Sequence, residues 1–382
     1  MRQAVLAGVV TAVVGFTSSF AVVLAGLQAM GATAGQAGSG LMVLCLTMGL
    51  GCMLFAWRTR LPITMAWSTP GAALLASSAT PAGGFATAVG AFVVAGLLLA
   101  LCGLVKPLER LVGAIPTPVA NAMLAGVLLG ICVQPFRDLV AAPAALGPVI
   151  LAWAVAMFVA RRWAVPIALL VAGVVMVGSG ALAHVSAAAL APRPEVVAPA
   201  FDGATMVAVG VPLWIVTMTS QNIPGMAVLR SFGYSPRLAP TLVYSGSATA
   251  AGALMGGHAI NLAAISAALA AGPEAHPDKG RRWVAALACG VTYLAFGPLS
   301  PGVAAVAEAA PQGLLAAIAG LALVGTFASS ASAALAEPSM RDAAALTFVV
   351  AASGVAWLGI GAAFWALVAG LAWAGASRWV RR

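Results

Sequence analysis

The chain has 382 residues, of which 62% are hydrophobic and only 7% are charged, and its formal net charge is +9. Soluble globular domains carry about 25% charged residues, so this composition excludes a soluble protein. The apolar runs are continuous, whereas the strands of a membrane β-barrel alternate apolar and polar residues over ~10 positions. We therefore expect an all-α integral membrane protein.

Fourteen membrane spans are predicted, seven on each side of one long outer connection, residues 184–203. An odd number of spans makes the first repeat, 1–183, and the second repeat, 204–382, insert with opposite orientation, which is typical of secondary transporters. The predicted spans cover residues 4–28, 35–57, 62–78, 84–104, 114–133, 144–160, 164–183, 204–228, 239–256, 258–271, 283–305, 312–335, 342–357 and 360–377.

The basic residues predict the orientation of these spans. With the N-terminus inside, all of the 18 Lys and Arg residues except Arg137 and Arg193 fall at the inner side. This asymmetry follows the positive-inside rule, places both termini in the cytoplasm and removes the reason to expect a nucleic-acid partner. The alternative is a cleaved signal peptide ending near "ATA" at 32–34, but cleavage there would disturb the alternation of charge.

The five cysteines all lie within predicted spans and show no CxxC spacing. We expect them to be small apolar packing residues and predict no disulfide, metal site or cofactor.

The first span of each repeat carries polar residues in matching positions. "TSSFAVVLAGLQAMG" (17–31) and "TSQNIPGMAVLRSFG" (219–233) are identical at five of 15 positions. Ser18 and Ser19 offer hydroxyls to a ligand, and Phe20 offers a ring for stacking; the alternative is ordinary helix packing.

The third span of each repeat contains a break. In "PITMAWSTPGAALLASSA" (62–79), Pro70 and Gly71 predict an extended chain to about Thr69 and a helix after it. In "MGGHAINLAAIS" (255–266), Gly257 and its neighbour Gly256 permit a similar break, with Asn261 as an N-cap of the following helix.

Two half-helices that begin inside the membrane would point their N-termini at one spot. Each N-terminus bears about half a positive charge, so the pair would hold an anion without Lys or Arg. Trp67 and Ser68 lie beside the first of these ends. The alternative is a pair of ordinary kinked packing helices.

Gln221 and Asn222 form the richest polar pair inside a predicted span, just before Pro224. Proline removes a helical hydrogen bond and distorts the preceding turn, and side-chain amides donate and accept hydrogen bonds. This pair therefore suits a carboxylate ligand, although interhelical hydrogen bonding is the alternative.

His258 is the titratable group expected deep in a span, and its ordinary pKa of about 6.5 suits proton coupling. The alternative is a neutral structural histidine. Glu308 and Glu337, near span ends, are the other proton-coupling candidates.

The segments "TMAWSTPGAALL" (64–75), "SQNIPG" (220–225), "GGHAINLAAI" (256–265) and "FGPLSPG" (296–302) closely resemble the benzoate membrane transport family. Its members are proposed benzoate/proton symporters of bacteria, so the resemblance implies a bacterial inner-membrane protein, a small aromatic anion and protons. The likeness covers nearly the whole chain.

That family is similar in architecture to uracil permeases and sulfate-type anion transporters. The resemblance implies a 7+7 inverted repeat, with spans 1–4 and 8–11 as a mobile core and spans 5–7 and 12–14 as a gate. It further implies elevator-type transport, and proteins of this architecture often form homodimers. The predicted substrate-binding residues are Ser18, Ser19, Phe20, Trp67, Ser68, Thr69, Gly71, Gln221, Asn222, Gly257, His258 and Asn261.

The sequence is also compatible with other functions. Uracil permeases use an acidic residue in span eight, where this chain has Gln221 and Asn222, so a nucleobase fits less well than an aromatic acid. A different anion and a channel are further alternatives. An intramembrane enzyme using Ser68 and His258 lacks a third orienting group, and we do not expect an enzyme.

Overall fold

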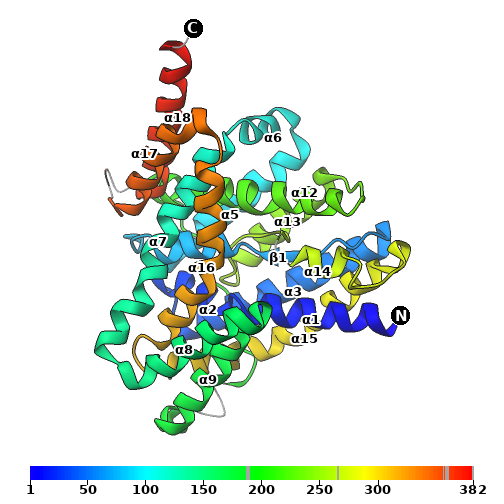
Figure 1. Cartoon of the computed structure of the whole chain (residues 1–382), viewed down its shortest axis with the longest axis vertical. Helices are drawn as coiled ribbons and strands as arrows, with labels where there is room; N and C mark the ends of the chain where they lie inside the picture. Colours follow the sequence, from blue (N-terminus) through cyan, green and yellow to red (C-terminus); the bar gives the residue numbers. More distant parts are fainter. Residues whose placement is uncertain (186–189, 265, 356, 358–360, 381–382) are drawn as a thin grey trace.

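The computed structural model describes residues 1–185, 190–264, 266–355, 357 and 361–380, and this part of the chain is mostly helical (Figure 1). Seven of the described helices are long and apolar enough to cross a membrane, and a pair that meets at an angle of 57°, Lys279–Phe296 and Ser300–Glu308, makes an eighth. The prediction of a helical multi-pass membrane protein is therefore confirmed. The count of fourteen spans stays a prediction.

The helices of the first half come in chain order, with β1 (Met65–Trp67) between α3 and α4. They are α1 (Arg2–Thr17), α2 (Phe20–Ala29), α3 (Ala34–Thr59), α4 (Thr69–Ala76), α5 (Gly84–Leu104), α6 (Lys106–Gly113), α7 (Thr117–Ala141), α8 (Pro143–Val159) and α9 (Ala164–Gly178).

The second half begins with one long helix whose geometry changes along its length, and β2 (Ile260–Leu262) lies between α13 and α14. Its elements are α10 (Gly203–Thr205), a π-helical turn (Met206–Gly210), α11 (Val211–Thr217), a second π-helical turn (Met218–Asn222), α12 (Ile223–Ser231), α13 (Leu238–Ala253), α14 (Ala267–Ala271), α15 (Trp283–Glu308), α16 (Leu314–Leu335), α17 (Arg341–Ala352) and α18 (Ala362–Val380).

The helices pack in two sets. In one, α3 and α1 lie along α15, α5 lies along α13, and α2 packs on α4. In the other, α7 lies against α16, α17 and α18, and α8 packs on α9. Figure 1 shows α17 and α18 at one end of the long axis and α8 and α9 at the other. The main contacts between the sets join α2 to α16 and α4 to α7.

Glycine lets α5 and α13 approach closely within the first set. A Cβ on Gly246 would lie 2.2 Å from the backbone nitrogen of Ala100, and one on Gly96 would lie 2.6 Å from that of Ala250. Such close backbone approach is typical of helix pairs in membranes, where small residues replace the missing hydrophobic driving force.

The two predicted breaks meet near the centre of the molecule, where Figure 1 labels β1. β1 pairs with β2 in antiparallel register, Ala66 opposite Asn261 and Trp67 opposite Ile260. The expectation of an all-α fold is therefore wrong at this point. Two extended segments inside a membrane have unpaired backbone groups, and they satisfy one another by forming a two-stranded sheet.

The helices after the strands differ in length. α4 begins at Thr69, which confirms that the chain stays extended to about that residue. α14 contains only five residues, so the second half-helix is much shorter than the first. A further break, not predicted, separates α1 from α2 at Ser18 and Ser19, where Ser19 leaves helical geometry with φ −151° and ψ 0°.

Candidate substrate cavity

The start of α4 is fixed by a buried hydrogen-bond network around Ser68. The Ser68 hydroxyl accepts from the N–H of Gly71 at 3.1 Å and from the hydroxyl of Thr217 at 2.8 Å. The Ser68 N–H donates to the carbonyl of Ala259 at 2.8 Å, which continues the strand pairing. Ser68 thus acts as the N-cap of α4 and joins it to α11 and to the segment before β2.

Asn222 ties the second π-helical turn to β2. Its Oδ1 accepts from the N–H of Leu262 at 2.9 Å, and its Nδ2 donates to the carbonyl of Thr217 at 3.3 Å. The distortion expected before Pro224 is present as this π-helical turn, in agreement with the loss of a helical hydrogen bond at proline. Asn222 is fully buried and links the second π-helical turn to β2.

Asn261 is not the N-cap of α14, and that expectation is corrected. It lies within β2, its Nδ2 donates to the carbonyl of Leu262 at 2.9 Å, and α14 begins after Ser266. The extended pairing with β1 continues past Asn261, so the chain turns helical later than the sequence pattern indicated.

A cavity of about 240 Å³ lies where the break between α1 and α2 meets β1 and the π-helical turn. All its described lining side chains are uncharged. This volume lies just below the range for small-ligand sites, about 300–1,000 Å³. It is lined by Val14, Gly15, Ser18, Ser19, Met48, Ala66, Trp67, Thr69, Gln221, Ala264, Ser266, Leu269, Tyr293, Ala322, Gly325 and Thr326.

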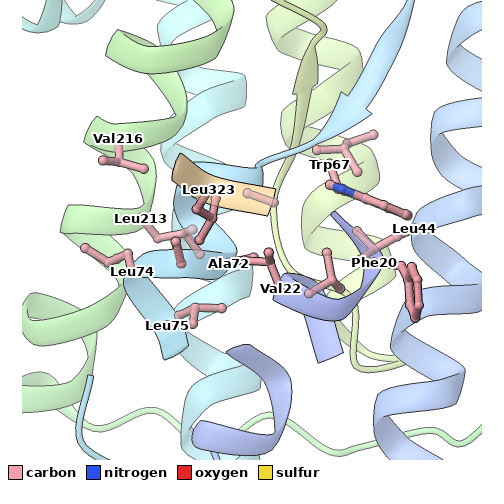
Figure 2. Packing of buried hydrophobic residues seen from close by; sticks show 14 of the residues in the cluster. Phe20, Val22, Leu44, Trp67, Ala72, Leu74, Leu75, Leu213, Val216 and Leu323 are labelled. Atoms are coloured by element: carbon pink, nitrogen blue, oxygen red, sulfur yellow. The ribbon is translucent and has the colours of Figure 1, made fainter. Parts of the chain in front are cut away.

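Trp67 and Ser19 form one wall of this central cavity. The Trp67 Nε1–H donates to the Ser19 hydroxyl at 2.8 Å, and the Ser19 hydroxyl lies 3.2 Å from the carbonyl of Gly15, to which it donates. In Figure 2, Trp67 and Phe20 lie on the side of the core that carries Leu44. The wall is therefore aromatic and polar at once.

A second cavity, of about 400 Å³, adjoins the central one. Gln221, Ala264 and Thr326 line both, so the two cavities lie side by side. The second cavity also contacts the beginning of α7 at Thr117 and the later part of α16 at Ser330. Its hydroxyl and amide groups make it polar, and we call it the hydroxyl vestibule.

The structure brings together five of the predicted binding residues at the central cavity: Ser18, Ser19, Trp67, Thr69 and Gln221. Six others are buried but lie outside the described lining: Ser68, Gly71, Asn222, Gly257, His258 and Asn261. Phe20 faces a different, apolar cavity on the other side of the aromatic cluster around Phe16.

The titratable candidates lie apart from the cavity wall. His258 is 1% exposed, and its Nδ1 lies 3.1 Å from the carbonyl of Ala259. Because a carbonyl only accepts, Nδ1 bears the proton, and Nε2 has no partner among the described residues. Glu308 and Glu337 are both exposed, at the end of α15 and before α17.

Three hydroxyl-bearing residues of the central cavity, Ser266, Tyr293 and Thr326, were not predicted from the sequence. Tyr293 of α15 lies against α1, where a Cβ on Gly15 would come within 2.4 Å of its hydroxyl oxygen. Thr326 of α16 lines both cavities. Tyr293 stands shortly before the motif "FGPLSPG", and that proximity is the signal that would have pointed to it.

The arrangement defines a multi-pass membrane protein with a small uncharged cavity between two interrupted spans. The family model for the benzoate membrane transport protein matches residues 1–376. The chain therefore belongs to this family of membrane transporters.

Two relatives agree with this assignment. The chain is 36% identical to the inner membrane protein YdcO of Escherichia coli (strain K12) over 365 residues, which cover 96% of this chain and 93% of that protein. It is 31% identical to the benzoate membrane transport protein of Acinetobacter baylyi over 314 residues, which cover 82% of this chain and 79% of the relative.

The fold is similar to that of two solved structures. The transmembrane domain of the cyanobacterium bicarbonate transporter BicA aligns with a TM-score of 0.62 at 16% identity, covering 97% of this chain and 98% of that one. SLC26A9 aligns with a TM-score of 0.66 at 13% identity, covering 97% of this chain and 65% of that one. At such low identity these likenesses show the fold alone.

Proposed function

We propose that the protein imports benzoate, or a closely related aromatic carboxylate, together with protons across the bacterial inner membrane. Family membership and the name of the Acinetobacter baylyi relative support the substrate class. The observation that most strongly supports this function is the central cavity itself, which is small, uncharged, and both aromatic and polar.

The carboxylate would lie near the start of α4. Thr69 and Gln221 line the cavity there, and the N-terminus of α4 adds a partial positive charge. A hydroxyl and an amide can both donate hydrogen bonds to a carboxylate. The ring would lie toward Trp67 and Leu269, whose apolar surfaces line the rest of the cavity.

The hydroxyl vestibule offers a route to the cytoplasm. It contacts α12 before Arg230 and the start of α7 after Arg110, two basic positions that the positive-inside rule places inside. We infer that both termini are cytoplasmic and that the structure represents an inward-facing state.

The two sets of packed helices are consistent with a core and a gate. We propose fourteen spans in a 7+7 inverted repeat, with the core formed by residues of spans 1–4 and 8–11 and the gate by spans 5–7 and 12–14. The cavities lie along the contact between the sets, where α2 meets α16. Sliding of the core against the gate, within each subunit of a homodimer, would expose the central cavity to each side in turn.

Proton coupling has a physical reason. An inside-negative potential opposes the entry of one negative charge by about 2.3 kcal/mol per 100 mV. Co-transport of a proton with each anion removes this electrical penalty. We propose His258 as the coupling group, because its neighbour Ala259 is bonded to the N-cap of α4.

The test is uptake of radiolabelled benzoate by proteoliposomes, with and without an inward proton gradient. Neutral benzoic acid crosses bare lipid, so protein-free liposomes set the background. We expect saturable uptake above that background, with accumulation that requires the gradient. Saturable uptake that does not depend on the proton gradient would contradict symport. Absence of benzoate uptake, with uptake of bicarbonate or sulfate instead, would overturn the substrate.

A further inference from the structure

A third cavity, of about 360 Å³, lies on the other side of the aromatic cluster from the central cavity. All its described lining side chains are apolar. Apart from Leu190 and Ala310, they come from α2, α9, α15 and α16, and the cavity therefore lies between the two sets of packed helices. We call it the apolar cavity.

The three cavities follow α16 in order. The apolar cavity contacts Leu314 and Ile318, the central cavity contacts Ala322 and Thr326, and the hydroxyl vestibule contacts Thr326 and Ser330. At 1.5 Å per residue, the stretch of α16 from first to last contact measures about 24 Å. This is most of the thickness of a bilayer core, about 30 Å. The three cavities thus lie at successive levels along α16.

An aromatic cluster separates the apolar cavity from the central cavity. Phe20, which lines the apolar cavity, is stacked on Phe16 with ring centroids 5.5 Å apart and planes at 14°. Phe16 also contacts Phe296 at 5.0 Å and Trp67 at 5.6 Å, and Trp67 lines the central cavity. A ring that leaves the apolar cavity for the central one would pass from one aromatic surface to the next.

From these observations we propose that the apolar cavity is an outer docking subsite for the aromatic ring of the transported acid, occupied before the core moves. Apolar cavities of about 150 Å³ already bind benzene, so the volume suffices for one substituted ring. The inference rests on the proposed function and adds a second binding position to it.

The lining and the mouth of the cavity favour a ring that arrives from outside. Leu190 of the outer connection closes one side, where a Cβ on Gly302 would lie 3.4 Å from its Cδ2. The carboxylate would remain at this outer mouth in contact with water, because an apolar wall cannot compensate its desolvation. The ring alone would enter and stack toward Phe20.

Glycine at position 173 permits a sharp test. Gly173 of α9 lines the apolar cavity, and a Cβ there meets no described atom within 4 Å. Gly173→Leu therefore places an apolar side chain at the cavity, and its Cβ displaces no described atom. Gly178→Leu is the matched control, because Gly178 ends the same helix, has equally open surroundings and lies outside the described lining.

Two measurements separate this inference from the proposed function. In benzoate uptake from the outer side, we expect Gly173→Leu to raise KM about tenfold at unchanged maximal rate, with Gly178→Leu like wild type. In equilibrium binding, we expect ¹⁹F line broadening of 4-fluorobenzyl alcohol by the purified protein in nanodiscs, lost in Gly173→Leu and kept in Gly178→Leu. The second measurement requires no transport, so it stands even when benzoate is not carried.

Each contrary outcome would overturn the inference. Equal KM and equal probe binding in Gly173→Leu and wild type would show that no ring binds there. A lower maximal rate at unchanged KM would show that filling the cavity only impedes motion. A phospholipid that co-purifies with wild type and is lost from Gly173→Leu would assign the cavity to an acyl chain.

Discussion

The indole Nε1–H of Trp67 donates a 2.8 Å hydrogen bond to the hydroxyl of Ser19 and so joins β1 to the break between α1 and α2. Trp67 is 3% exposed and Ser19 is 6% exposed. A buried donor that loses its acceptor costs about 1–3 kcal/mol. The position of the aromatic wall therefore depends on one serine in an interrupted helix.

Ser19→Ala should destabilise the protein by about 1–3 kcal/mol and weaken benzoate uptake, because it leaves the Trp67 N–H without its acceptor. Ser18→Ala is the control for stability, since the Ser18 hydroxyl donates to the carbonyl of Gly15 and takes no part in holding Trp67. Thermal unfolding in detergent and uptake kinetics measure the two effects. Equal unfolding temperatures for the two variants would contradict the role given to this hydrogen bond.

Substitutions of Gln221 and Asn222 should have different effects, the first on benzoate binding and the second on stability, although the two residues are neighbours in sequence. Asn222→Leu removes the acceptor of the Leu262 N–H and should lower the unfolding free energy by about 1–3 kcal/mol. Gln221→Leu should leave stability nearly unchanged and raise the KM for benzoate about tenfold or more, because Gln221 lines both the central cavity and the vestibule. Thermal unfolding and uptake assays on both variants measure these effects. Lower stability in Gln221→Leu, together with a raised KM at unchanged stability in Asn222→Leu, would contradict the roles given to the two residues.

Local sequence patterns predicted where the backbone is interrupted, but they did not predict which polar side chains face the cavity. Proline and glycine spacing located the break before α4 and the distortion before Pro224, because these residues act on the local backbone. The pairing of β1 with β2 joins segments nearly 200 residues apart, and no local pattern reveals it. Asn261 was therefore read as a cap when it is a strand residue.

Side-chain direction explains the remaining differences at the site. Gln221 and Asn222 look equivalent in sequence, yet the π-helical turn aims one at the cavity and the other at β2. Tyr293 and Thr326 were missed because a single hydroxyl in an apolar span is common in membrane helices. Phe20 was expected to stack on a ligand at the site, but its ring stacks on Phe16 and faces the apolar cavity.

Gly246→Leu should prevent correct folding, because α5 and α13 touch at this residue. The new Cβ would lie 2.2 Å from the nitrogen of Ala100, and a backbone neighbour cannot move aside as a side chain can. Overpacking commonly costs 1–3 kcal/mol and more where backbone must shift, so we expect about 3 kcal/mol or more. Gly375→Leu is the control, since no described atom lies within 4 Å of its Cβ. Size-exclusion chromatography of both variants measures this, and equally monodisperse peaks would contradict it.

Asp202 should make a small, acid-sensitive contribution to stability where the outer connection enters α10. Hydrogen bonds from the Thr205 hydroxyl and N–H lower the pKa of its carboxyl. A lowered folded-state pKa means stabilisation that is present above the unfolded value of about 3.9 and is lost as pH falls through the folded value. Asp202→Asn should remove this dependence. Unfolding temperatures at pH 6 and pH 3 should differ less in the variant than in wild type, and an equal difference would refute the assignment.

His258→Gln should abolish proton coupling while leaving the fold intact. The Nδ1–H of His258 donates to the carbonyl of Ala259, and that carbonyl also accepts from the N–H of Ser68, the N-cap of α4 at the cavity. A proton gained at Nε2 would strengthen the first bond and so alter the donors that face the carboxylate. Glutamine can still donate to Ala259 but does not titrate.

Uptake of benzoate by proteoliposomes should therefore no longer depend on the proton gradient in His258→Gln. The dependence should persist in Glu308→Gln and Glu337→Gln, because the wild-type carboxylates at these two positions are exposed away from the cavity. Unchanged coupling in His258→Gln, with loss in either glutamate variant, would give His258 a structural role and transfer proton carriage to that glutamate.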